Sequence, residues 1–94
     1  MAAPNPQQRV VHFRGHVQGV GFRQTTRMVA QQFAVSGYVK NLADGQVKLV
    51  MVGRADELDR FEQAIDQRLG EFIRDRSVEV LPATDQYDQF EIRY

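Results

Sequence analysis

A glycine-rich segment that ends in an arginine is the part of the sequence best suited to bind an anion. Residues 15–23 read Gly-His-Val-Gln-Gly-Val-Gly-Phe-Arg, and a helical pattern begins at Phe22. A loop that leads into a helix in this way directs several free backbone N–H groups at one point, where the helix dipole adds roughly half a positive charge. Arg23, in the first helical turn, adds a planar fork of donors that matches phosphate oxygens. The segment therefore predicts a site for phosphate or carboxylate.

The spacing of these glycines differs from that of nucleotide-binding loops. It fits neither GxGxxG nor GxxxxGK[ST], and no lysine follows to hold β- and γ-phosphates. We therefore expect a cradle for one small phosphate, although glycine-rich turns before helices also occur with a purely structural role. The residues expected to form the cradle are His16, Val17, Gln18, Gly19, Val20, Gly21, Phe22 and Arg23.

Alternating and helical patterns predict the elements that must position this loop. Strands with one buried face alternate apolar and polar side chains, whereas amphipathic helices repeat every 3.6 residues. The expected strands are residues 9–14, 37–41, 46–52, 77–81 and 90–94, and the expected helices run from Phe22 to before Gly37 and over residues 54–69. Asp44-Gly45 between two of these strands indicates a hairpin.

The order of these elements is strand, helix, strand, strand, helix, strand, with a short extra strand at the end. This order predicts an α+β, ferredoxin-like two-layer sandwich: an antiparallel-dominated sheet of four to five strands with two helices on one face. A strand–helix–strand crossover makes the first two strands parallel, and the third strand then lies between them. The glycine loop and Asn41 should therefore lie at the same edge of the sheet, about 10 Å apart, a gap that a small anion and one water can bridge.

Composition narrows the function further. The chain has 94 residues, 43% hydrophobic and 26% charged, with zero formal net charge and no cysteine. These values are typical of one globular domain, exclude disulfides, zinc–thiolate sites and cysteine nucleophiles, and argue against a general polyanion binder. We expect residues 1–8 to form a flexible tail and residues 9–94 a single domain. No stretch approaches the roughly 20 apolar residues of a membrane span, so we expect no membrane partner. The balanced charge argues against a nucleic-acid partner. We also expect the protein to be a cytoplasmic monomer.

The motifs of this chain resemble those of the acylphosphatase family. They read Gly15-x-Val17-Gln18-Gly19-Val20-Gly21-Phe22-Arg23, Gly37-Tyr38-Val39-x-Asn41, Asp44-Gly45-x-Val47 and Phe90-x-Ile92-x-Tyr94. The likeness covers residues 9–94, and its first block is highly specific. One departure is Ala34, at a position where many members of the family have a glycine near the end of the first helix.

This resemblance implies a reaction and a division of roles. The reaction is hydrolysis of acyl phosphates to a carboxylate and inorganic phosphate, without metal or cofactor, with inorganic phosphate as product and inhibitor. The resemblance implies that the loop amides and Arg23 bind the phosphate and that Asn41 orients the attacking water. It implies no general base, and substrate phosphate oxygens can accept the proton.

Two alternative functions compete with this hypothesis. One is a non-enzymatic or specialised acylphosphatase-like domain that binds phosphate or carbamoyl phosphate, as in hydrogenase-maturation proteins. The other is RNA recognition on the sheet, which needs an aromatic platform that residues 46–52 lack.

Other polar residues have structural explanations. His12 and His16 are about 13 Å apart in an extended chain, too far for a shared metal ion. Asp44 fits a hairpin turn better than a general base. The acidic residues at the start of the second helix, Asp56, Glu57 and Asp59, compensate its dipole. Support of Arg23 by Thr25 or Thr26, and a part for Arg14 in substrate entry, stay open.

Overall fold

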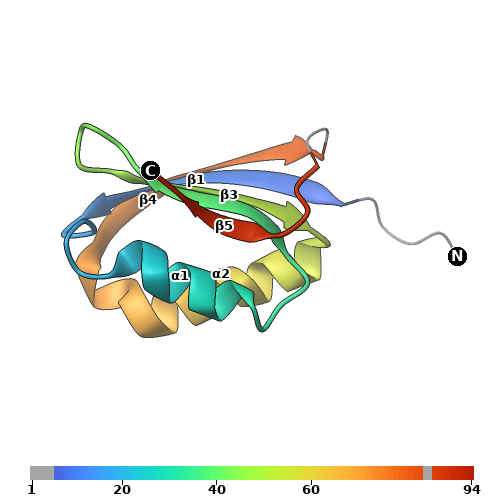
Figure 1. Ribbon diagram of the computed structural model, residues 1–94, viewed down its shortest axis with the longest axis horizontal. Coiled ribbons are helices and arrows are strands. Elements are labelled where there is room, and N and C mark those ends of the chain that lie inside the picture. Colours follow the sequence, from blue (N-terminus) through green and yellow to red (C-terminus); the bar gives the residue numbers. More distant parts are fainter. Residues whose placement is uncertain (1–5, 84–85) are drawn as a thin grey trace, which may run out of the picture.

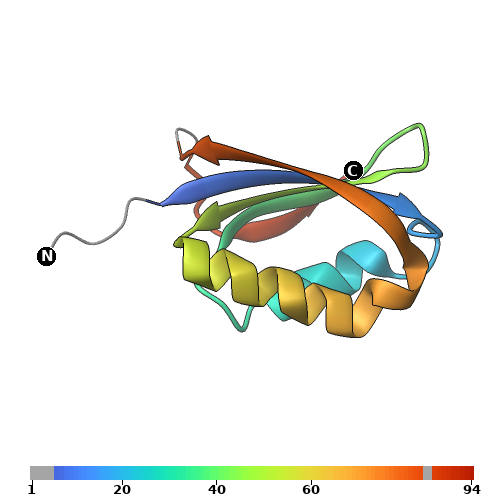
Figure 2. The ribbon, with the colours of Figure 1, turned by 180° about the vertical axis from the view of Figure 1, so that it is seen from behind.

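The computed structural model describes residues 6–83 and 86–94, which form a five-stranded sheet and two α-helices. The elements in chain order are β1 (Gln7–Gly15), α1 (Phe22–Ala30), β2 (Ser36–Asn41), β3 (Val47–Gly53), α2 (Ala55–Leu69), a 3₁₀ turn (Gly70–Phe72), β4 (Ile73–Pro82) and β5 (Phe90–Arg93). Both helices cover the same face of the sheet (Figure 1), and the view from behind shows the same two layers (Figure 2). None of the described helices has the length and apolar composition needed to cross a membrane.

The sheet topology confirms the predicted fold class. The strand order is β4-β1-β3-β2-β5, so β3 lies between β1 and β2 and is antiparallel to both. β4 pairs antiparallel with β1, and the short β5 adds parallel to β2 at the other edge. Because β1 and β2 run in the same direction, the loop after β1 and the hairpin after β2 leave the same end of the sheet. This arrangement is the one that the element order predicts.

The core lies between the sheet and the helices. Val11 and Phe13 of β1 and Leu49 and Met51 of β3 are fully buried, as the alternation along these strands predicts. They pack in one cluster with the apolar stripes of α1 and α2. Burial of large apolar side chains supplies the main driving force for this packing.

The structure corrects three boundaries. The expected tail over residues 1–8 is too long, because Gln7 and Gln8 belong to β1, and Gln8 is only 6% exposed. Residues 1–5 lie outside the described residues. β4 begins at Ile73, not at Ser77. α1 already ends at Ala30 and continues as a turn, in which Gln32 and Phe33 donate backbone hydrogen bonds to Val29 and Ala30.

Neither α1 nor α2 uses a left-handed residue at its C-terminal end. Among the described residues, all positive φ angles belong to glycines, so Ala34 occupies an ordinary conformation. The Ala34 amide instead donates a hydrogen bond of 2.8 Å to the Glu57 carboxylate of α2. Gly70 ends α2 with a φ of −56° and leads directly into the 3₁₀ turn. Ala34 therefore takes the place of the family's glycine before β2 without backbone strain.

Candidate active site

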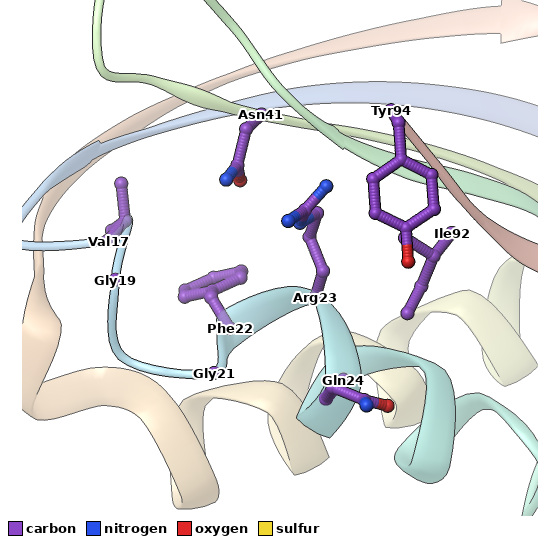
Figure 3. A pocket seen from close by; sticks show the side chains of 9 residues that line it. All are labelled: Val17, Gly19, Gly21, Phe22, Arg23, Gln24, Asn41, Ile92 and Tyr94. Carbon is purple, nitrogen blue, oxygen red and sulfur yellow. The ribbon is translucent and has the colours of Figure 1, made fainter.

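A cavity of about 150 Å³ lies at the end of the sheet where β1 and β2 terminate. Its walls come from the loop after β1, the start of α1, the end of β2 and the region of β5 (Figure 3). The lining residues are Val17, Gly19, Gly21, Phe22, Arg23, Gln24, Asn41, Ile92 and Tyr94. The structure therefore brings the predicted glycine loop, Arg23 and Asn41 to one place. It adds Gln24, Ile92 and Tyr94, which motif reasoning did not assign to the site.

The loop that lines this cavity carries backbone N–H groups without a hydrogen-bond partner among the described residues. Gly19 and Gly21 have φ angles of 80° and 77°, in the left-handed region that favours glycine. The amides of residues 17–21 donate no hydrogen bond to any of the described residues, in contrast to most backbone N–H groups of a folded protein. Gly21 caps α1 without a side-chain hydrogen bond, and the first turn of α1 holds no acidic residue. An anion is the partner that such a helix start favours.

Three of the residues expected in the cradle have other surroundings. The His16 amide donates a hydrogen bond of 2.9 Å to the Phe72 carbonyl, and the His16 side chain is exposed outside the cavity. Its amide is therefore occupied in this structure, because β1 continues to pair with the segment before β4. Val20 packs against the core. The Gln18 side chain contacts the hairpin after β2 rather than the cavity.

Arg23 reaches the cavity from the first turn of α1. Its Nη1 donates to the Arg93 carbonyl at 3.4 Å, and its guanidinium carbon lies 4.8 Å from the centre of the Tyr94 ring. Within residues 6–83 and 86–94, no carboxylate forms an ion pair with Arg23. A carbonyl and an aromatic face thus hold the side chain in place without neutralising its charge.

Asn41 approaches the same space from the opposite wall. It is the last residue of β2 and pairs with Val47 of β3. Figure 3 shows its carboxamide directed toward the space that the Arg23 guanidinium also faces. Its Oδ1 is buried and accepts no hydrogen bond from the described residues. A buried acceptor without a partner costs about 1–3 kcal/mol, so this oxygen is suited to a donor that arrives with the ligand, such as water.

Other polar groups near the site have local roles. The Asp44 carboxylate accepts hydrogen bonds from the Gln46 backbone N–H at 3.1 Å and from Gln46 Nε2 at 2.6 Å, and these bonds lower the pKa of Asp44. Asp44 thus shapes the hairpin and does not line the cavity. Neither the Thr25 nor the Thr26 hydroxyl accepts a hydrogen bond from the Arg23 side chain among the described residues, and the buried Thr26 hydroxyl has no partner there. Within residues 6–83 and 86–94, no three histidine, aspartate or glutamate side chains lie close enough together to hold a metal ion.

Gln18 makes a contact that sequence reasoning missed. Its Nε2 donates to the carbonyls of Leu42 and Gln46, at 2.8 and 2.9 Å. These partners lie more than 20 positions away, and carbonyl acceptors carry no side-chain identity. No local pattern therefore predicts the contact. The alternation of Phe90, Ile92 and Tyr94, by contrast, was a usable signal that Ile92 and Tyr94 share a face.

Fold and site together define a small α+β protein with an arginine-lined cavity at one end of its sheet. The family model for acylphosphatase matches residues 9–92. An acylphosphatase from Archaeoglobus fulgidus is 42% identical over 85 residues, which cover 89% of this chain and 94% of that protein. One from Yersinia pseudotuberculosis is 39% identical over 87 residues, with coverage of 90% and 94%.

Solved structures agree with these sequence relatives. The crystal structure of acylphosphatase from Bacillus subtilis has a TM-score of 0.81 and 31% identity, and covers 95% of this chain and 99% of that chain. Full-length HypF in its phosphate- and nucleotide-bound form matches 99% of this chain with a TM-score of 0.82 and 25% identity, but over only 12% of its own length. The chain belongs to the acylphosphatase family.

Proposed function

We propose that this enzyme hydrolyses acyl phosphates to a carboxylate and inorganic phosphate, by attack of a water molecule that Asn41 orients. The observation that carries the proposal is the shared cavity, which is lined by the Arg23 guanidinium, by the Asn41 carboxamide and by a loop whose amides, like the Asn41 Oδ1, have no hydrogen-bond partner among the described residues. The amides of the loop and the Arg23 fork bind the three phosphate oxygens. The Asn41 Oδ1 accepts a hydrogen bond from the water and directs its oxygen at phosphorus.

The bond changes balance without a side-chain base. The water oxygen forms a bond to phosphorus while the bond between phosphorus and the acyl oxygen breaks, and the carboxylate leaves with that electron pair. A phosphate oxygen takes the water proton. Phosphoryl transfer depends mainly on positioning and on stabilisation of charge at the equatorial oxygens, to which an arginine contributes about 10³–10⁵ in rate. An oriented side-chain amide is worth roughly 10²–10³ by analogy with oxyanion-hole donors.

A phosphate-binding domain without turnover is the second candidate. The likeness to 12% of HypF supports it, because the same fold there forms a small part of a longer chain whose structure contains phosphate. The match to the acylphosphatases from Archaeoglobus fulgidus and Yersinia pseudotuberculosis covers 94% of each of those proteins. This match supports an acylphosphatase more strongly than a binding domain without turnover. Our proposal also includes a cytoplasmic monomer that inorganic phosphate inhibits, and sedimentation tests the oligomeric state.

The decisive experiment follows the loss of acetyl phosphate with and without inorganic phosphate. We expect turnover that phosphate inhibits competitively. In Arg23→Ala, kcat/KM should fall by about 10³–10⁵ and phosphate inhibition should weaken strongly, because both need the guanidinium fork. Arg68→Ala, at an exposed position of α2, is the matched control and should behave like the parent protein. Tight phosphate binding without turnover in the parent protein would favour the second candidate.

A further inference from the structure

The Gln18 side chain connects the two halves of the cavity wall. Gln18 lies between Val17 and Gly19, which both line the cavity on the side of the phosphate cradle. Its Nε2 donates one hydrogen bond to the carbonyl of Leu42, the residue directly after Asn41, and another to the carbonyl of Gln46. Both N–H groups of the amide are therefore used, each on the hairpin that carries Asn41.

The two acceptors are the two ends of the hairpin loop. The Leu42 amide donates to the Gln46 carbonyl at 2.8 Å, and the Gly45 amide donates to the Leu42 carbonyl at 3.2 Å. Gln18 adds a second hydrogen bond to each of these carbonyls from outside the loop. In the described part of the chain, no other hydrogen bond joins residues 16–21 to residues 41–46. Sheet pairing fixes where β1 and β2 end, and the Gln18 side chain supplies the direct hydrogen bonds from the cradle to the hairpin beyond that sheet.

The Asn41 side chain gives this connection its importance. Since its Oδ1 has no partner among residues 6–83 and 86–94, the place of the carboxamide depends on the backbone at the end of β2. The first carbonyl beyond that end is that of Leu42, which Gln18 holds. A shift of about 1 Å between reacting groups can cost on the order of 10²-fold in rate.

We propose that Gln18 is a positioning residue, which sets the distance between the phosphate in the cradle and the water on Asn41. This inference rests on the proposed function and deepens it. Gln18 touches neither phosphate nor water through its side chain. Its removal therefore affects the chemical step and spares phosphate binding, since the loop amides and Arg23 stay in place.

The test compares two variants that remove the donors in different ways. Gln18→Met keeps the approximate length of the side chain without donors or charge, and Gln18→Glu places a carboxylate against two carbonyl oxygens. With acetyl phosphate at neutral pH, we expect kcat to fall by about 10–100-fold in both variants. In Gln18→Met, which adds no charge, the competitive inhibition constant of inorganic phosphate should stay close to that of the parent protein. Gln67→Glu, the same chemical change at an exposed position of α2, is the control.

The pH profile separates positioning from a general loss of structure. Two carbonyl oxygens favour the protonated form of the new carboxyl, which donates one hydrogen bond. The ratio of kcat in Gln18→Glu to kcat in the parent protein should therefore rise as the pH falls, whereas the ratio for Gln18→Met should stay flat. Thermal unfolding of each variant confirms that the kinetic constants refer to folded protein.

A double variant tests the route through Asn41. If Gln18 acts by placing that carboxamide, then Gln18→Met combined with Asn41→Ala should lose no more kcat than Asn41→Ala alone. Fully additive losses would overturn the proposal. Unchanged kcat in both single variants would also overturn it, as would a loss of phosphate affinity in Gln18→Met as large as its loss of kcat. Each of these results leaves acyl phosphate hydrolysis by the parent protein untouched, so the proposed function is judged separately.

Discussion

Arg23 differs from most other arginines of this protein in what surrounds its charge. Arg9 pairs with Asp59 and Glu62, and Arg60 and Arg76 also face carboxylates. Arg23 instead contacts a carbonyl and a tyrosine ring. An incoming phosphate therefore meets a full positive charge and displaces no carboxylate, which preserves the electrostatic gain of binding.

The role of Asn41 leads to a prediction at the same scale. Under the proposed mechanism, Asn41→Ala removes the acceptor for the attacking water and leaves the loop amides and Arg23 intact. We expect kcat for acetyl phosphate to fall by roughly 10²–10³, with little change in the inhibition constant of inorganic phosphate. Steady-state kinetics with phosphate as competitor measures both quantities.

Asn41→Asp is the informative companion to this variant. It keeps an oxygen acceptor but brings a negative charge into a cavity built for an anion, so phosphate affinity should fall as well as kcat. Equal losses of kcat and phosphate affinity in Asn41→Ala would instead mean that Asn41 binds the phosphate itself.

Close pairing of β2 and β3 gives a prediction at the scale of elements. Gly37 of β2 has a φ of 135°, and a Cβ at this position would lie 2.0 Å from the Val50 carbonyl oxygen of β3. Gly37→Ala must therefore separate two paired strands in addition to accepting an unfavourable φ. We expect a loss of more than about 2 kcal/mol in the free energy of unfolding, measured with urea.

A second glycine with a positive φ, but with open surroundings, provides the comparison. Gly45 in the hairpin has a φ of 92°, and a Cβ there meets nothing within 4 Å. Gly45→Ala should cost only the backbone term of about 1–2 kcal/mol. Equal costs for the two substitutions would show that strand separation contributes nothing.

The link between α2 and the turn after α1 predicts a pH dependence. The Glu57 carboxylate accepts the Ala34 amide and pairs with Arg60, and both contacts lower its pKa below the ordinary value of 4.5. A pKa that is lowered on folding gives stability that is present above the unfolded-state value and is lost as the pH falls through the folded-state value. At neutral pH, Glu57→Gln should therefore melt at a lower temperature than the parent protein.

This difference should shrink in acid. Below the folded-state pKa of Glu57, the parent protein is protonated at this position and resembles the variant, so the two melting curves should converge. A constant gap in melting temperature from neutral pH to acid would contradict the assigned cause.

The whole molecule should respond to phosphate, because the cavity exists only when segments distant in sequence come together. A ligand that binds only the folded state at ten times its dissociation constant adds about 1.4 kcal/mol of stability. For a domain of this size we expect a rise in melting temperature of about 6–11 °C. Arg23→Ala should lose most of this rise, and chloride at the same ionic strength should not reproduce it.

The elements that bury one face were the most predictable parts of the fold. The core-facing side chains of β1 and β3 recur at every second position, at Val11 and Phe13 and at Val47, Leu49 and Met51, and Asp44-Gly45 marks the hairpin. The first residues of β1 and of β4 were not predictable, because backbone pairing holds them and their side chains are largely polar. In the site, the local motif predicted the loop and Arg23. The Gln18 contact and the cavity wall at Tyr94 depend on long-range geometry.

Tyr94 has an unusual combination of properties for a residue at a reaction site. It lines the cavity beside Arg23, yet it is 91% exposed and lies outside the packed core. Replacing it demands no repacking of the interior, in contrast to Phe22 on the inner wall, which is 2% exposed. Natural variation at this outer position therefore costs little in core packing, and the price of a change falls instead on the aromatic face beside the Arg23 guanidinium.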